Sequence, residues 1–114
     1  MRDQADSAPN GATQLRTCDL ARLTGVGKAT IEHYLRLDLL RPVGVGAQGY
    51  RLFDDDAVAR IRVIRSGRHA GFALRELHAM LQVVAPAELH GLLATLSPSQ
   101  CRAVLAARGV ALGD

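Results

Sequence analysis

Residues 44–53 read GVGAQGYRLF, a segment in which three glycines precede a short run of mainly apolar residues. A glycine-rich composition is typical of a tight turn, because glycine adopts backbone conformations closed to other residues. The run Tyr50-Arg51-Leu52-Phe53 that follows is typical of a short strand. The segment therefore predicts a β-hairpin, placed between helical patterns on both sides.

Two short helices are predicted before this hairpin. The first begins after Thr17, its expected N-cap, and Gly25 is the residue that ends it. The second spans about residues 28–37 and has apolar residues at helical spacing. Pro42 cannot continue a helix, so the chain must leave the second helix before the hairpin begins.

Two more helices are predicted after the hairpin. Asp54 is the expected cap of the first, and residues 69–71 are expected to break it. Its expected buried stripe consists of Val58, Ile61 and Ile64. The next helix ends near Val84, because Pro86 follows directly.

The last segment predicts two shorter helices. Pro86 suits the first position of one, and Ser97-Pro98-Ser99-Gln100 has the cap, proline and capping-box glutamine that start the other. Their apolar side chains can form a dimer interface or bind a partner protein, or they can pack on their own domain. These side chains are Leu89, Leu92, Leu93, Leu96, Val104 and Leu105.

The chain of 114 residues thus divides into three predicted parts. Residues 1–14 form a disordered lead, residues 15–84 a domain, and residues 85–114 a helical tail. The predicted fold is mostly α: a winged helix-turn-helix with a small β-hairpin wing and two short C-terminal helices. We expect a cytoplasmic protein, because no apolar run is long enough for a membrane span and the N-terminus lacks the apolar core of a signal peptide.

Positive charge is concentrated in the middle of the chain. Residues 15–75 hold eleven basic and six acidic side chains, a net charge of +5, while the segments on either side each carry −1. A segregated basic module is the charge pattern of a surface that binds phosphates, and a helix pair followed by a wing is a shape that docks on duplex DNA.

The same elements resemble the MerR family of transcription regulators over about two thirds of the chain. Their order and spacing match without large gaps. The motifs that carry the resemblance are Leu23-Thr24-Gly25-Val26, Leu39-Leu40-Arg41-Pro42, Gly49-Tyr50-Arg51-Leu52-Phe53-Asp54 and Gly71-Phe72.

The resemblance implies that the second helix enters the major groove and that the wing contacts the phosphate backbone. Arginine in the wing is suited to this role, since its planar fork matches phosphate. Tyr34 and Tyr50 can serve as DNA contacts or as core aromatics, and both interpretations stay open. The expected DNA-binding residues are Lys28, Thr30, His33, Tyr34, Arg36, Tyr50, Arg51, Arg65 and Arg68.

Four features depart from the family pattern. The second helix has Glu32-His33-Tyr34 where the family has an Arg-Tyr-Tyr-like triplet, Asp38 replaces a glycine, and Gly44 stands where the wing tip usually has a basic residue. Glu32 would repel phosphates unless it accepts a hydrogen bond from cytosine or pairs with Arg36. In addition, Pro86 and the proline twelve residues later interrupt the long dimerisation helix of the family.

The sequence lacks the signatures of other functions. Metal sensors of this family use cysteine pairs, whereas Cys101 has no second cysteine nearby, so both cysteines are expected to be free thiols. The histidines lack ligand spacing, and the glycines of the hairpin lead into a strand rather than into a helix, unlike those of a phosphate-binding loop. We therefore predict no metal ion, no cofactor and no enzyme activity.

The sequence as a whole predicts a homodimeric, sequence-specific DNA-binding transcription regulator. An alternative is a winged-helix protein-interaction module in which DNA binding is weak or lost and the tail helices bind a partner protein. A third possibility is an architectural role in phage or plasmid recombination.

Overall fold

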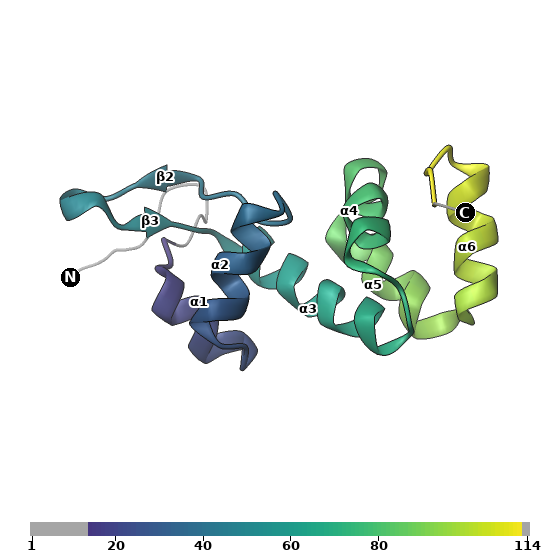
Figure 1. Ribbon diagram of the computed structural model, residues 1–114, viewed down its shortest axis with the longest axis horizontal. Coiled ribbons are helices and arrows are strands. Elements are labelled where there is room, and N and C mark those ends of the chain that lie inside the picture. Colours follow the sequence, from purple (N-terminus) through teal and green to yellow (C-terminus); the bar gives the residue numbers. More distant parts are fainter. Residues whose placement is uncertain (1–13, 113–114) are drawn as a thin grey trace. The chain divides into compact units, whose positions relative to one another are not determined.

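The computed structural model describes residues 14–112; most of the predicted disordered lead and the last two residues of the tail lie outside this range. The described chain is mainly helical, with one antiparallel hairpin (Figure 1). It divides into two compact units, Met1–Val58 and Ala59–Asp114. The elements in order are α1 (Thr17–Thr24), α2 (Lys28–Arg36), β2 (Gly44–Val45), the 3-10 turn η2 (Ala47–Gly49), β3 (Arg51–Leu52), α3 (Asp55–His69), α4 (Leu74–Val83), α5 (Pro86–Thr95) and α6 (Pro98–Ala107).

Helix α1 begins one residue earlier than the sequence suggested. Arg16, not Thr17, is the N-cap, and Thr17 is the first helical residue. The Arg16 backbone N–H donates to Oδ2 of Asp19 at 2.9 Å. The carboxylate at the third helical position thus satisfies the N-cap backbone, and no hydroxyl side chain caps the helix. Gly25 ends the helix as predicted, with φ 78° in the left-handed region.

Helix α2 ends in a tight turn at Asp38. This residue has φ 63°, a left-handed conformation that glycine adopts most easily. Its carboxylate binds Arg41 through two hydrogen bonds of 2.8 and 2.7 Å. Aspartate is one of the few other residues that tolerate this conformation, so Asp38 can form this turn.

The hairpin forms where the glycine-rich segment predicts it. Gly44 pairs with Leu52, and Val45 pairs with Arg51. The turn is residues 46–50, closed by the Gly46 N–H donating to the Tyr50 carbonyl at 2.7 Å. Gly44 therefore lies within a strand, and the expectation that it occupies the wing tip is wrong.

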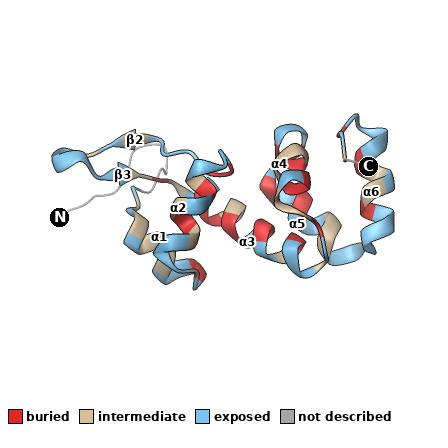
Figure 2. Cartoon of the chain, in the orientation of Figure 1, coloured by how far each residue is buried: buried red, intermediate tan, exposed pale blue. Residues whose placement is uncertain are grey.

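The first unit has a small aliphatic and aromatic core. A bridge between Leu15 and Phe53, with N···O distances of 2.8 and 2.7 Å, holds the start of the described chain against the end of the hairpin. Buried side chains come from both helices, the turn after α2 and the hairpin (Figure 2). The largest of them are Leu20, Ile31, Tyr34, Leu39, Leu40 and Phe53.

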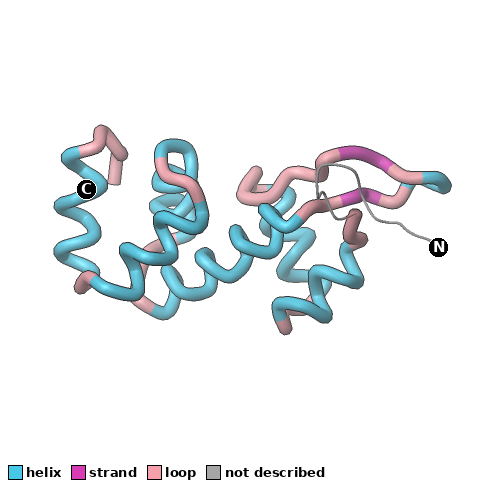
Figure 3. Tube along the Cα trace, turned by 180° about the vertical axis from the view of Figure 1, so that it is seen from behind, coloured by secondary structure: helices cyan, strands magenta, loops and turns pink. Residues whose placement is uncertain are grey.

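The second unit contains most of α3 together with α4, α5 and α6. Short loops at residues 70–73, 84–85 and 96–97 join these helices (Figure 3). The predicted stripe of α3 is buried, with Ile61 and Ile64 fully enclosed. Gly67 of α3 lies against Leu77 of α4, and a Cβ at this glycine would stand 2.3 Å from a Leu77 methyl carbon. Glycine is thus required for these two helices to pack this closely.

The tail helices pack within the second unit. The Ser97 capping box is formed as predicted, with Gln100 N–H donating to Ser97 Oγ at 3.2 Å. Arg102 of α6 forms an ion pair with the buried Glu76 of α4, and its guanidinium carbon lies 4.6 Å from the Phe72 ring centroid. Arg108 of the segment after α6 binds Glu88 of α5, N···O 2.6 Å. These contacts fix α6 against the helices that precede it.

This packing changes the set of side chains offered for dimerisation or partner binding. Leu89 and Leu105 are fully buried in the core of their own unit, so they are not available to a second chain. Leu92, Leu93, Leu96 and Val104 are partly exposed. The physical reason is that a short amphipathic helix buries only the part of its apolar face that packs inside its own unit.

Both cysteines are free thiols, as predicted. Cys101 is buried and its Sγ donates to the Leu92 carbonyl at 3.3 Å, while burial raises the pKa of this thiol. No helix between residues 14 and 112 has both the length and the apolar character needed to cross a membrane.

Candidate nucleic-acid interface

One side of α2 faces solvent. Ile31 and Tyr34 point into the core, which leaves Lys28, His33 and Arg36 exposed on the remaining surface. Thr30 is partly exposed. A helix with buried residues three apart presents the positions between them outward. These four side chains therefore form the outward surface of the second helix of a helix-turn-helix.

Tyr34 belongs to the core. Only 7% of this residue is exposed, so its ring fills the space between α2 and the rest of the first unit. Of the two interpretations that the sequence left open, the structural one holds for Tyr34. Its ring is therefore removed from the set of expected DNA contacts.

Tyr50 of the wing is different, since 44% of it is exposed. The guanidinium carbon of Arg16 lies 4.2 Å from its ring centroid, a cation–π contact. Sequence reasoning did not select Arg16. The Leu15–Phe53 bridge brings it beside the wing, and no local pattern indicates a contact between residues so far apart in the chain.

Arg51 of β3 is held by Glu32 of α2. Its Nη1 lies 3.0 Å from Glu32 Oε2 and 3.3 Å from Oε1, and the two side chains are 48% and 41% exposed. Glu32 thus pairs with the wing and not with Arg36, the partner that helical spacing also allowed. This ion pair connects the two elements expected to contact DNA, the helix and the wing.

Each of three acids in the first unit has an arginine partner. Besides the Glu32–Arg51 pair, Asp19 binds Arg22 at 2.9 Å and Asp38 binds Arg41 at 2.7 Å. The Arg16 backbone N–H, with further help from Arg22, lowers the pKa of Asp19. Each of these acids therefore offsets a basic side chain of the same unit.

Two basic side chains of α2 are not neutralised by an ion pair of this kind. Within the described residues, Lys28 and Arg36 have no ion-pair partner. Both are exposed on the outward face of α2. They are thus the basic side chains of that helix most available to an anionic partner.

Arg65 and Arg68 lie on α3 and belong to the second unit. Both are exposed, and Arg68 Nη1 donates to the Phe72 carbonyl at 3.2 Å. This hydrogen bond fixes the loop that follows α3, so Arg68 has a structural role beside any role at a surface. Arg65 also lines a hollow of the second unit that is described below.

The described residues offer no cluster for a metal ion: no three histidine, cysteine, aspartate or glutamate side chains between residues 14 and 112 come together in a suitable group. His69 and His90 are exposed, and His78 is partly exposed.

A helix pair, an exposed second helix and a hairpin wing define a winged helix-turn-helix protein. Residues 15–83 match the family described as MerR HTH family regulatory protein. The match covers more than half of the chain, so this chain belongs to the MerR family, as its sequence motifs predicted.

Several characterised proteins are similar to this chain. The mercuric resistance operon regulatory protein of Bacillus cereus is 35% identical over 71 residues, which is 62% of this chain and 54% of that protein. The HTH-type transcriptional regulator MerD of Acinetobacter calcoaceticus is 38% identical over 68 residues, covering 60% and 56% of the two chains. The chain thus spans about half the length of these relatives.

Solved structures share the fold. A MerR family transcriptional regulator from Bacillus cereus has a TM-score of 0.59 at 22% identity and covers 85% of this chain and 70% of its own. MtaN, the N-terminus of the Bacillus subtilis multidrug transporter activator, has a TM-score of 0.58 at 24% identity and covers 87% and 99%. At this level of identity the similarity confirms the winged helix-turn-helix fold.

Proposed function

We propose that this protein is a sequence-specific DNA-binding transcription regulator. In this function α2 enters the major groove and the wing contacts the phosphate backbone. The observation that carries the proposal is the joining of these two elements in one compact unit by the Glu32–Arg51 pair, next to an outward face that holds Lys28 and Arg36.

Each exposed group has a suitable role. Lys28 and Arg36 donate to phosphates or to base edges, and Arg36 can bind guanine O6 and N7 with two parallel hydrogen bonds. Thr30 and His33 supply further donors on the same helix. In the wing, Arg51 and Tyr50 donate to the adjacent backbone, with Arg16 adding a positive charge beside Tyr50.

We further propose that the protein binds as a homodimer in the cytoplasm. Two copies would place two α2 helices at half-sites related by two-fold symmetry. The partly exposed apolar side chains of the tail are the proposed contact, since partial exposure leaves apolar area that a second copy can cover. They are Leu92, Leu93, Leu96 and Val104.

One observation favours a second candidate, a protein-interaction module with weak DNA binding. Arg22, Arg41 and Arg51 each face an acid of their own unit, which reduces the positive field available to phosphates. In that case the tail would bind a partner protein. Salt separates the two functions, because DNA binding weakens steeply with salt and an apolar contact does not.

The test is a fluorescence-anisotropy titration with duplex DNA from upstream of the protein's own gene, at low and moderate salt, against an unrelated duplex. Arg51→Ala is compared with Arg75→Ala, which removes an exposed arginine of α4. We expect selective binding that Arg51→Ala weakens and Arg75→Ala leaves unchanged. Equal binding of both duplexes at every salt concentration, with screening of genomic fragments giving no preferred site, would contradict the proposal.

A further inference from the structure

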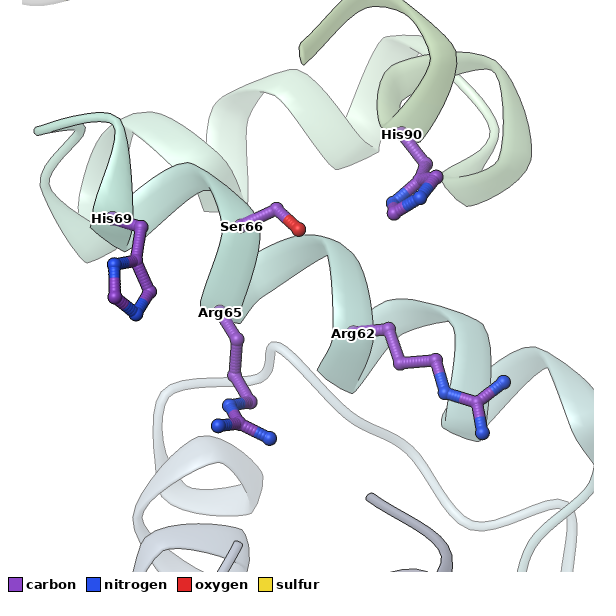
Figure 4. A pocket seen from close by; sticks show the side chains of 5 residues that line it. All are labelled: Arg62, Arg65, Ser66, His69 and His90. Carbon is purple, nitrogen blue, oxygen red and sulfur yellow. The ribbon is translucent and has the colours of Figure 1, made fainter. Parts of the chain in front are cut away.

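The second unit has a hollow of about 490 Å³ that the proposed function does not use. Four of its lining side chains come from α3 and one from α5 (Figure 4). They are Arg62, Arg65, Ser66, His69 and His90. Its volume lies within the usual range of small-molecule sites.

The α3 residues share one face of the helix because they occur at spacings of three, four and seven. Two guanidinium groups, a hydroxyl and an imidazole are thereby brought to one wall. His90 of α5 lies across the hollow from α3, and the Ser66 hydroxyl points toward the α5 side (Figure 4). All five side chains can donate hydrogen bonds, and none is acidic.

A smaller hollow of about 270 Å³ adjoins the first. Both are lined by Arg62 and His90, so these two side chains stand at their common border. The rest of the smaller hollow is apolar, made by Ala59 of α3 with Pro86 and Ala87 of α5. A cationic hollow thus continues into an apolar one.

We propose that this double hollow binds a small organic phosphate monoester, with the phosphate against the α3 side chains and a compact apolar body against Ala59, Pro86 and Ala87. A phosphate presents three strong acceptor oxygens in a tetrahedral arrangement, which suits donors that approach from several directions. Arginine pairs bind such groups through two parallel hydrogen bonds. A carboxylate has only two oxygens in one plane and would leave donors of the α3 wall unused.

The apolar extension distinguishes this ligand from a DNA backbone. A phosphodiester chain needs a line of donors open at both ends, whereas Pro86 and Ala87 close one side of this site with apolar surface. The site also requires α5, which lies outside the helix-turn-helix and wing. The inference therefore does not rest on the proposed DNA function, although Arg65 is also one of the expected DNA contacts.

The test uses isothermal titration calorimetry with the full chain, without DNA and at constant ionic strength. The probes are phenyl phosphate, inorganic phosphate, benzoate and phenol. We expect phenyl phosphate to bind with a Kd of about 0.1–1 mM, which is typical of a small and open site. Inorganic phosphate, which lacks the apolar body, should bind roughly tenfold more weakly, because burial of a phenyl ring adds at least one factor of ten.

Matched variants locate the site. Arg62→Ala and His90→Ala should each weaken phenyl phosphate roughly tenfold, since each removes a donor to a charged group. Arg75→Ala and His78→Ala, which change α4 residues outside both hollows, should leave the affinity unchanged. Circular dichroism melts confirm that all four variants fold.

Three outcomes would overturn the proposal. Equal affinity for phenyl phosphate and inorganic phosphate would mean general anion attraction, and tighter binding of benzoate would assign a carboxylate site instead. Loss of duplex DNA binding in Arg62→Ala and His90→Ala, with no phenyl phosphate binding to the unaltered chain, would make the hollow part of the DNA surface. Failure of the Arg51→Ala experiment, in contrast, would leave these results untouched.

Discussion

The Glu32–Arg51 pair makes a sharp prediction: Glu32→Gln should strengthen DNA binding. In the free protein the wing arginine is 3.0 Å from the Glu32 carboxylate. A phosphate that binds Arg51 from its other side is repelled by the negative charge of this nearby carboxylate. Replacing the carboxylate by a neutral amide of nearly the same shape removes that repulsion and keeps a hydrogen-bond acceptor for Arg51.

The magnitude follows from Coulomb's law. With the guanidinium between them, the carboxylate and phosphate charges lie about 7 Å apart, which costs about 0.6 kcal/mol in bulk water and about 2.4 kcal/mol at an effective dielectric constant of 20. Since both side chains are close to half exposed, the true value lies toward the lower end. Glu32→Gln should therefore increase affinity by roughly three- to tenfold, while breaking an exposed pair lowers the free energy of unfolding by only about 0.2–1 kcal/mol.

The assay is fluorescence anisotropy with the preferred duplex over a series of salt concentrations. The gain should shrink as salt rises, because the repulsion is screened. The matched control is Asp38→Asn, which breaks another exposed acid–arginine pair of the same unit, one that does not join α2 to the wing. An equal gain from Asp38→Asn would show only an effect of net charge, and weaker binding by Glu32→Gln would refute the reasoning and assign Glu32 a positive role, such as contact with cytosine.

Three further predictions concern stability, each measured by thermal or denaturant unfolding. Gly67→Ala should lower the free energy of unfolding by about 1–2 kcal/mol, because its Cβ would stand 2.3 Å from an enclosed leucine methyl, whereas Gly91→Ala, with nothing within 4 Å, should raise it by about 0.5–1 kcal/mol. Equal effects would disprove the close packing of α3 on α4. Asp38→Val should cost roughly 1–2 kcal/mol and Asp38→Gly should not, since φ is 63°; similar losses in both variants would instead identify the carboxylate as the stabilising feature. The hydrogen bond from Arg102 lowers the pKa of Glu76 below its usual 4.5, and the hydrogen bond from the Ala73 backbone lowers it further. The ion pair should therefore stabilise the fold above about pH 4.5 and lose this contribution as the pH falls through the lowered pKa. Glu76→Gln should therefore be less stable than the unaltered chain at pH 7, and the difference should shrink as the pH is lowered below 4.5; a difference that stays constant throughout acid titration would refute this account.

The candidate surface was predictable only in part. The outward positions of α2 follow from helical spacing, and Lys28, His33 and Arg36 are exposed where that spacing puts them. Tyr34 occupies the same helix yet faces inward, because which aromatic fills a core depends on the elements packed against it. Likewise, two of the six apolar tail residues are enclosed and four are not, although all repeat at helical spacing.

The sequence by itself determined the local architecture of this protein. Gly25, the glycine-rich hairpin, Pro86 and the Ser97 capping box placed the helices and the wing within a residue or so of their observed bounds. Such signals work because they restrict backbone angles and satisfy helix ends within three or four residues. The family motifs are built from the same signals.

Only the tertiary structure decided which side chains meet across elements. Arg51 binds Glu32 nineteen residues away, Arg102 binds Glu76 twenty-six residues away, and Arg16 stacks on Tyr50. Each contact depends on how separate helices and strands approach, and that approach is set by burial of the shared core rather than by any local preference. An acid in the second helix therefore has a partner in the wing that no helical spacing could predict.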